Sequence, residues 1–203
     1  MDVKKLYREQ SRLAKKSILT DSFGMIKQIG GVDCSYLNDE YIIAGLVVLE
    51  FNSLEVIYRT FDVRKLTFPY IPGLLAYREA DAMMDVIRKS KVRTDLIMVD
   101  GFGANHPRRC GIAMHIGVKL DIPTIGVGKS FLCGEIRDDY IYQDGEKTGK
   151  LVRAKPGMKP VYISPGHRVS LETSIGIVTH CMAGHRQPEP TRLAHEYVTG
   201  LKG

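Results

Sequence analysis

Residues 25–64, MIKQIGGVDCSYLNDEYIIAGLVVLEFNSLEVIYRTFDVR, decide the fold. Two short polar turns, Asn-Asp-Glu at 38–40 and Asn-Ser at 52–53, separate runs rich in β-branched and aromatic residues. The β-rich runs span 25–36, 41–51 and 54–64. Because turns this short join neighbouring antiparallel strands, the segment predicts a three-stranded meander.

After the meander, helical patterns alternate with compact apolar runs, which is typical of βαβ units with a parallel sheet. The predicted elements are a helix over 74–90, a strand over 96–99, a helix over 107–120 and a strand over 123–127. A hairpin around the polar turn at 144–146 and two helices, over 170–183 and 191–201, follow. The sequence therefore predicts an α/β fold: a mixed sheet, antiparallel meander first and parallel βαβ units second, with helices on both faces.

The composition is that of one folded domain, 1–203. Of the 203 residues, 44% are hydrophobic and 26% are charged, which excludes disorder for most of the chain. The apolar runs fall short of the ~18 residues that cross a bilayer. The first ten residues lack the apolar segment of a secretory signal. We therefore expect a cytoplasmic protein without a membrane partner, and a monomer.

The formal net charge of +6 permits an anionic partner such as nucleic acid. Six cations lie on a predicted first helix over 3–18, where they form either a solvated basic face or a phosphate-facing surface. They are Lys4, Lys5, Arg8, Arg12, Lys15 and Lys16. The four cysteines show no C-x-x-C or zinc-finger spacing, so we expect reduced thiols.

Two aspartates lie within or directly after predicted strands. Asp33 lies within a β-rich run, where aspartate is depleted. Asp100 follows the apolar strand 96–99, and the carboxyl ends of parallel strands commonly carry functional groups. A solvent-facing strand residue and an ordinary Asp-Gly turn are the alternative explanations.

Glu79 and His195 are the other candidates for a metal site. Glu79 is four residues after Leu75 and three before Ala82, so it falls in the apolar stripe of its helix. A carboxylate on the core side needs a cation or a metal, unless it reaches solvent from the edge of the stripe. His195 lies on the last helix, where a packed or surface histidine is the simpler interpretation. Oxygen ligands with one imidazole suit Mg²⁺ or Mn²⁺.

Two loops could contact a base. Residues 68–73, Phe-Pro-Tyr-Ile-Pro-Gly, hold Tyr70 between two prolines, so an aromatic ring is presented on a stiff loop. Residues 100–107, Asp-Gly-Phe-Gly-Ala-Asn-His-Pro, place glycine backbone directly before a predicted helix. A core-covering turn and an ordinary connection are the alternatives. A P-loop is excluded, because Pro123 stands where the first glycine is required before Lys129.

In combination, these segments resemble the endonuclease V family, whose motifs appear here in family order from residue 31 to 195. The matching segments are Gly31-Val-Asp-Cys-Ser35, residues 68–79, residues 100–107, Pro123-Thr-Ile-Gly-Val-Gly-Lys-Ser130, Ser164-Pro-Gly-His167 and Pro188-Glu-Pro-Thr-Arg-Leu-Ala-His195. The resemblance implies a ribonuclease-H-like fold. It also implies a Mg²⁺-dependent endonuclease, with Mn²⁺ as a substitute, that acts in DNA repair on deaminated bases, chiefly inosine. Such an enzyme nicks the second phosphodiester 3′ of the lesion and leaves a 5′-phosphate and a 3′-hydroxyl.

The resemblance also implies roles for individual residues. The metal ligands match Asp33, Glu79, Asp100 and His195, and the catalytic lysine that contacts the scissile phosphate matches Lys129. The DNA wedge matches Pro69, Tyr70, Ile71 and Pro72. The base pocket matches Gly73, Leu75, Gly101, His106, Gly111 and Ile112. The chain departs from the family pattern at Phe102, where relatives are more polar, and at Gly128, where many have alanine.

Two rival functions remain at this stage. A junction resolvase or ribonuclease of the same fold would share the metal site but would not need the wedge. A non-catalytic binding module would favour lysines over the acidic set. The resemblance implies a substrate of nucleic acid containing inosine, either DNA or RNA, and the sequence does not decide between them.

Overall fold

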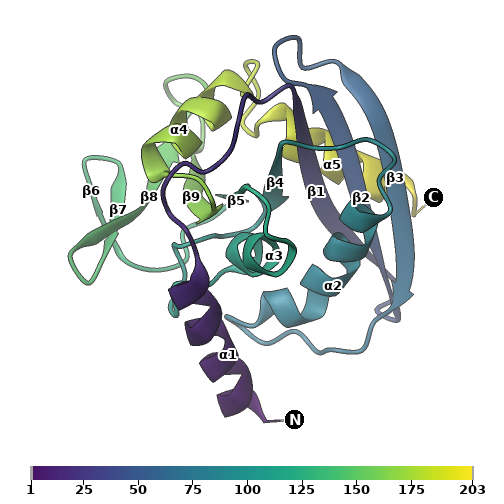
Figure 1. The fold of residues 1–203 in the computed structure, drawn as a ribbon, viewed down its shortest axis with the longest axis horizontal. Helices are drawn as coiled ribbons and strands as arrows, with labels where there is room; N and C mark the ends of the chain where they lie inside the picture. The colour runs from purple at the N-terminus through teal and green to yellow at the C-terminus, as the bar shows by residue number, and fades with distance from the viewer. Residues whose placement is uncertain (1, 203) are drawn as a thin grey trace.

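The computed structural model describes residues 2–202 as one continuous mixed sheet with helices on both sides (Figure 1). The strands are β1 (Gln28–Leu37), β2 (Tyr41–Glu50), β3 (Val56–Lys65), β4 (Leu96–Asp100), β5 (Thr124–Gly128), β6 (Glu135–Arg137), β7 (Tyr140–Gln143), β8 (Glu146–Val152) and β9 (Val161–His167). The helices are α1 (Val3–Lys16), α2 (Leu75–Arg88), α3 (Ile112–Leu120), α4 (Leu171–His180) and α5 (Glu189–Gly200). The nine strands lie in the order β3-β2-β1-β4-β5-β9-β8-β7-β6.

The sheet confirms the predicted fold class. β1, β2 and β3 pair antiparallel as a meander, and β4 and β5 extend β1 in parallel. In the parallel pair of β1 and β4, Val32 is the partner of Val99. The next residues along the two strands are Asp33 and Asp100, so the register brings the two aspartates to the same level of the sheet.

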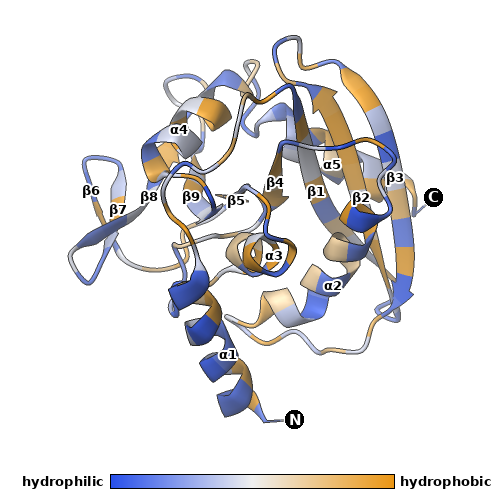
Figure 2. Ribbon diagram, in the orientation of Figure 1, coloured by the Kyte–Doolittle hydropathy of each residue, from blue (hydrophilic) through white to orange (hydrophobic). Residues whose placement is uncertain are grey.

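Two helical layers explain the hydrophobic pattern of the strands. α2 and α3 cover one face of the sheet, with Met83 and Ile116 in its core, and α4 and α5 cover the other, with Val178 and Ala194. β2 lies between the layers and is buried from Ile42 to Leu49, and Figure 2 shows it hydrophobic along most of its length. A strand covered on both faces is continuously apolar, whereas the edge strand β3 alternates between half-buried and exposed residues.

The structure differs from the sequence prediction in the start of one helix and in two strands. The third helix was predicted over 107–120, but α3 begins at Ile112, because Arg109 has a left-handed φ of 55° and the backbone N–H of Gly111 donates to the carbonyl of Gly103. Neither β6 nor β9 was predicted, because β6 is only three residues long and β9 contains Pro165 and glycine. β9 accommodates the proline where its pairing with β5 shifts register.

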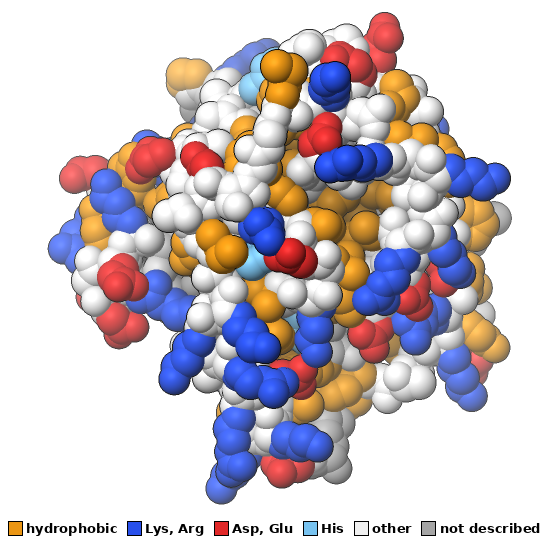
Figure 3. Space-filling view, viewed as in Figure 1, with side chains coloured by type: hydrophobic (Ala, Val, Ile, Leu, Met, Phe, Trp, Pro, Cys, Tyr) orange, Lys and Arg blue, Asp and Glu red, His pale blue; other side chains and the backbone are white. Residues whose placement is uncertain are grey.

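α1 lies apart from the sheet and packs on α3. Its buried residues are Gln10 and Leu13, and Leu13 joins a small core with Cys110 and Met114. The six cations of this helix are all exposed, and within residues 2–202 none of them forms an ion pair. Figure 3 shows blue side chains gathered over α1. The helix therefore presents a basic face to solvent, and contact with phosphates stays a prediction.

No helix within residues 2–202 is both long and apolar enough to cross a membrane.

Substitution of Gly31 is expected to destabilise the fold strongly. A Cβ at this position would overlap the backbone carbonyl of Pro190, at the start of α5. Backbone cannot yield as a side-chain tip can, so we expect Gly31→Ala to reduce the free energy of unfolding by about 3 kcal/mol. Urea unfolding measures this. Gly176→Ala, on α4, is the control, because nothing lies within 4 Å of its Cβ. A Gly31→Ala variant as stable as the wild type would contradict the packing of α5 on β1.

Candidate active site

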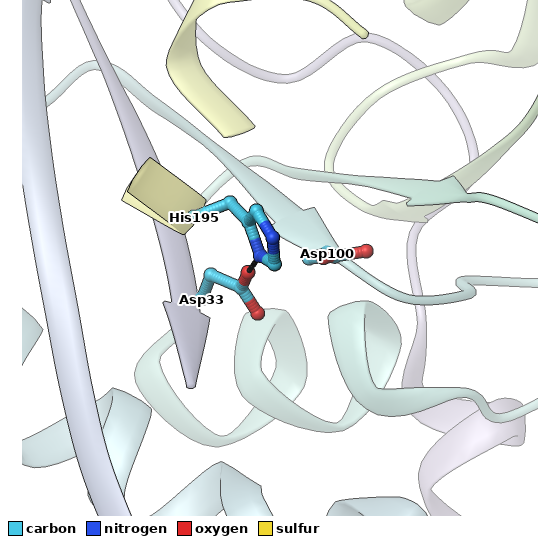
Figure 4. Close-up of side chains that lie close together, drawn as sticks. All are labelled: Asp33, Asp100 and His195. Atoms are coloured by element: carbon cyan, nitrogen blue, oxygen red, sulfur yellow. Dashed lines mark hydrogen bonds and ion pairs between the residues drawn. The ribbon is translucent and has the colours of Figure 1, made fainter. Parts of the chain in front are cut away.

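Three predicted ligands meet beside the middle of the sheet (Figure 4). Asp33 comes from β1, Asp100 from the end of β4 and His195 from α5, and one ligand atom of each lies within 4.8 Å of the other two. Nδ1 of His195 shares a hydrogen bond with Oδ2 of Asp33 at 2.7 Å. The backbone N–H of Cys34 donates to the other oxygen of Asp33 at 2.7 Å. Both partners fix the orientation of the Asp33 carboxylate.

Lys129 provides the nearest positive charge. It directly follows β5, and its ammonium contacts Oδ2 of Asp100 and lies 4.0 Å from Oδ2 of Asp33. Burial and the neighbouring Asp100 carboxylate raise the pKa of Asp33 to about 8, although Lys129 opposes the shift. Burial lowers the pKa of His195, which favours the neutral imidazole. The raised pKa of Asp33 shows that one lysine does not fully compensate the buried Asp33 and the half-buried Asp100 when both are ionised.

Glu79 is buried on α2, as the stripe predicted, but it stands outside the three-residue cluster. Its carboxylate accepts a hydrogen bond from the hydroxyl of Tyr36. Burial raises the pKa of Glu79 to about 7, and the nearby charge of Asp100 adds to the shift. The sequence did not identify Tyr36 as a partner of Glu79, because the residue pattern of β1 does not show that its hydroxyl reaches α2.

The cluster fits a divalent cation. Two carboxylates and a neutral imidazole offer the oxygen-rich, mixed donor set that suits Mg²⁺ or Mn²⁺. Their ligand atoms already converge, and ionising Asp33 as well as Asp100 would place more negative charge here than Lys129 can compensate. Such an excess is costly unless a cation neutralises it. Asp33, Asp100 and His195 would hold the ion. Glu79, a buried carboxylate outside the cluster, is the candidate for a further ligand.

The loop over 68–73 is pinned at both ends and exposed between them. Arg78 donates to the carbonyl of Phe68 at 2.6 Å, and the carbonyl of Gly73 accepts from Arg108 at the same distance. Tyr70, between these anchors, is 66% exposed. The structure thus shows an exposed aromatic ring on an anchored loop, and the role of residues 69–72 as a DNA wedge stays a prediction.

A cavity of about 190 Å³ opens next to this loop. It is lined by Gln10, Tyr70, Gly73, Leu75, Ala76, Phe102, His106, Cys110, Gly111, Ile112, Ser130 and Leu132. Of the residues predicted for the base pocket, only Gly101 does not line it. Gly101 lies behind the wall, where a Cβ would overlap the side chain of Ile112. Gln10 was not predicted, because it comes from a helix remote in the sequence.

The two departures from the family pattern are coupled. Phe102 lines the cavity, and its ring occupies the space that a Cβ at Gly128 would need. The aromatic side chain therefore requires glycine at 128. Phe102 also follows Asp100 by two residues, and Gly128 directly precedes Lys129. The same two segments thus build the cavity wall and the acidic cluster.

Gly128→Ala is expected to lower stability by ~1–3 kcal/mol through this overlap. The double variant Phe102→Ala, Gly128→Ala should be more stable than the sum of the two single changes indicates, because removing the ring makes room for the methyl group. Thermal unfolding of the four proteins in this cycle tests the coupling. Strict additivity would contradict it.

A mixed sheet with paired aspartates on adjacent parallel strands, next to a cavity, places the chain among the ribonuclease-H-like nucleases. A family model described as Endonuclease V matches residues 11–196. An endonuclease V of Dictyoglomus thermophilum is 43% identical over 199 residues, which cover 94% of this chain and 86% of that protein. The chain belongs to the endonuclease V family.

Solved structures agree. An endonuclease V of Streptomyces avermitilis superposes with a TM-score of 0.90 at 31% identity, covering 97% of this chain and 92% of that one. A Ciona intestinalis endonuclease V, in complex with a 24mer DNA containing an inosine followed by a ribo-adenosine, has a TM-score of 0.86 at 29% identity, covering 98% and 97%. The predicted family, the fold and the assignment as an endonuclease are confirmed.

Proposed function

We propose that this endonuclease binds nucleic acid containing a deaminated base, chiefly inosine, and nicks the second phosphodiester 3′ of it in DNA repair. The observation that carries the proposal is the shared wall: residues 100–102 and 128–130 serve both the acidic cluster and the cavity. A base held in the cavity would place its own strand beside the acidic cluster. The Ciona relative in complex with inosine-containing DNA supports this substrate.

The cavity is suited to an extruded purine. Glycine backbone and apolar side chains line it, and Tyr70 stands at its mouth. An enzyme that acts at a lesion takes the base out of the stack, and an aromatic side chain can fill part of the gap. In this arrangement, Tyr70 stacks against the remaining bases while the lesion occupies the cavity.

The acidic cluster and Lys129 perform the cleavage. Asp33, Asp100 and His195, with Glu79 nearby, hold the divalent ion, for which we propose Mg²⁺ with Mn²⁺ as a substitute. When bound, such an ion activates water and stabilises negative charge on the phosphate and the leaving oxygen. Lys129 places its ammonium toward the phosphate, adding fixed positive charge as the transition state forms. The products carry a 5′-phosphate and a 3′-hydroxyl.

We further propose that the chain acts on DNA as one catalytic domain, as a monomer and in the cytoplasm. The continuous sheet supports the single domain, because strands from residues 28 to 167 belong to it. Cys34, Cys110, Cys133 and Cys181 are all free, which suits a reducing compartment. RNA remains the alternative substrate.

A cleavage assay on matched duplexes tests the proposed function. The wild-type protein with Mg²⁺ should nick a duplex with one inosine and leave the same duplex with adenine at that position intact. A junction resolvase would instead cleave a four-way junction in preference to either duplex, and a binding module would cleave nothing. Either outcome would overturn the proposal.

Tyr70→Ala should weaken recognition of inosine more than it slows the chemistry. Base–aromatic stacking contributes roughly 1–3 kcal/mol, so we expect a rise of about tenfold in the dissociation constant for inosine DNA. The single-turnover rate at saturating enzyme should stay within about threefold of wild type, since Tyr70 is absent from the acidic cluster. Tyr41→Ala is the control, because Tyr41 is exposed but lies on β2. An unchanged dissociation constant would show that Tyr70 only covers the core.

A further inference from the structure

The carbonyl of Gly73 has more hydrogen-bond donors than it can use. Nη2 of Arg108 donates to this oxygen at 2.6 Å, Nε2 of Gln10 at 3.0 Å, and Nε2 of His106 lies 3.2 Å away. A backbone carbonyl has two lone pairs. Three N–H groups therefore compete for two places, and the longest and weakest contact is that of His106.

The hydrogen bonds around His106 identify its tautomer. The backbone N–H of Arg108 donates to Nδ1 of His106 at 3.2 Å, so Nδ1 carries a lone pair rather than a proton. Burial lowers the pKa of His106 to about 4, and the ring is neutral at pH 7. The single proton is therefore on Nε2, the atom that faces the Gly73 carbonyl.

Gln10 and Arg108 form a rigid pair behind this carbonyl. Gln10 is 1% exposed, and its Oε1 accepts from Nε of Arg108 at 2.6 Å. Its Nε2 also approaches the carbonyl of Cys110 at 3.3 Å, so one amide bridges two residues that line the cavity, Gly73 and Cys110. The Arg108 guanidinium lies 3.9 Å from the centre of the Tyr7 ring. α1 thereby holds both groups in place.

We propose that Gln10 and Arg108 are positioning residues that saturate the Gly73 carbonyl and so free the Nε2–H of His106 to donate to the bound base. This inference rests on the proposed function. The acceptor is a carbonyl oxygen on the purine ring. Hypoxanthine has such an oxygen at position 6, where adenine has an amino group, which is a donor. A hydrogen-bond donor fixed in the cavity therefore favours binding of the deaminated base and disfavours binding of adenine.

Gln10→Leu tests the proposal, because leucine keeps much of the volume but supplies neither donor nor acceptor. His106 then remains on the Gly73 carbonyl. In single-turnover cleavage with Mg²⁺, we expect the enzyme concentration at half-maximal rate on inosine DNA to rise about tenfold, and the maximal rate to stay within about twofold. Competition by undamaged duplex should be unchanged. The preference for inosine over adenine would thus fall about tenfold.

Lys119→Ala is the matched control. Lys119 of α3 binds Glu9 of α1 at 2.8 Å, so its loss also loosens α1 but leaves Gly73 untouched. It should keep the wild-type preference. Arg108→Met is a second variant, for the case that Gln10→Leu fails to fold, and it should lower the preference in the same direction.

The outcomes separate this inference from the proposed function. If the wild type has no preference for inosine, the proposed function is wrong. If the wild type prefers inosine but Gln10→Leu and Arg108→Met keep that preference, only the positioning role is overturned. An equal loss in Lys119→Ala would also overturn it, since the docking of α1 alone would then explain the effect.

Discussion

Asp100→Asn and Asp33→Asn should each reduce the nicking of inosine DNA by at least about a thousandfold, or ~4 kcal/mol in the activation barrier. The amide keeps the shape of the side chain but removes the negative charge that holds a divalent cation. Binding of inosine DNA should stay within about threefold of wild type, because the cavity does not include either residue. Single-turnover rates at saturating enzyme measure the chemistry, and filter binding measures the affinity.

Asp62→Asn is the control for this pair. Asp62 lies on the edge strand β3, two strands away from β1, and forms an ion pair with Lys89 at 2.8 Å outside the acidic cluster. It should cleave at the wild-type rate. If Asp33→Asn or Asp100→Asn retains activity within roughly tenfold of wild type, about 1.4 kcal/mol, the ligands are assigned wrongly.

The second large effect concerns the ion. Removal of divalent cations should abolish nicking, and Mg²⁺ or Mn²⁺ should restore it. Ca²⁺ should support binding without cleavage, because it takes more ligands at longer and less regular distances than Mg²⁺. Mn²⁺ should also relax base selectivity, since it tolerates imidazole and distorted geometry better. Titrating each ion into reactions on matched inosine and undamaged duplexes measures both effects. Full activity after exhaustive chelation would contradict a metal-dependent mechanism.

The parts of the site that follow from local patterns were predictable. Asp33 within one predicted strand and Asp100 directly after another were recognised as candidates from their local patterns, and the parallel pairing of β1 with β4 in the structure brings them together. Glu79 falls in the apolar stripe of its helix, and the structure buries it. The two prolines around Tyr70 predict a stiff loop with an exposed ring, and the ring is exposed.

The remaining parts depend on contacts between distant segments. Gln10 is 63 residues from Gly73 and 98 from Arg108, and no periodicity in α1 indicates either bond. The turn before α3 depends on the left-handed backbone at Arg109, which a helical hydrophobic pattern does not show. The need for glycine at 128 arises only because Phe102 packs there. Each of these features is a property of tertiary packing rather than of a local pattern.

Mapping the nick in a duplex with a single inosine tests the central claim most directly, namely that the cavity and the acidic cluster act on one strand at a fixed separation. The labelled strand is resolved beside a sequencing ladder, with Asp100→Asn as the inactive control. We predict one product, cut at the second phosphodiester 3′ of the inosine, with a 3′-hydroxyl and a 5′-phosphate, and the same offset when the inosine is moved along the duplex. Cuts at positions that do not move with the inosine would contradict the account.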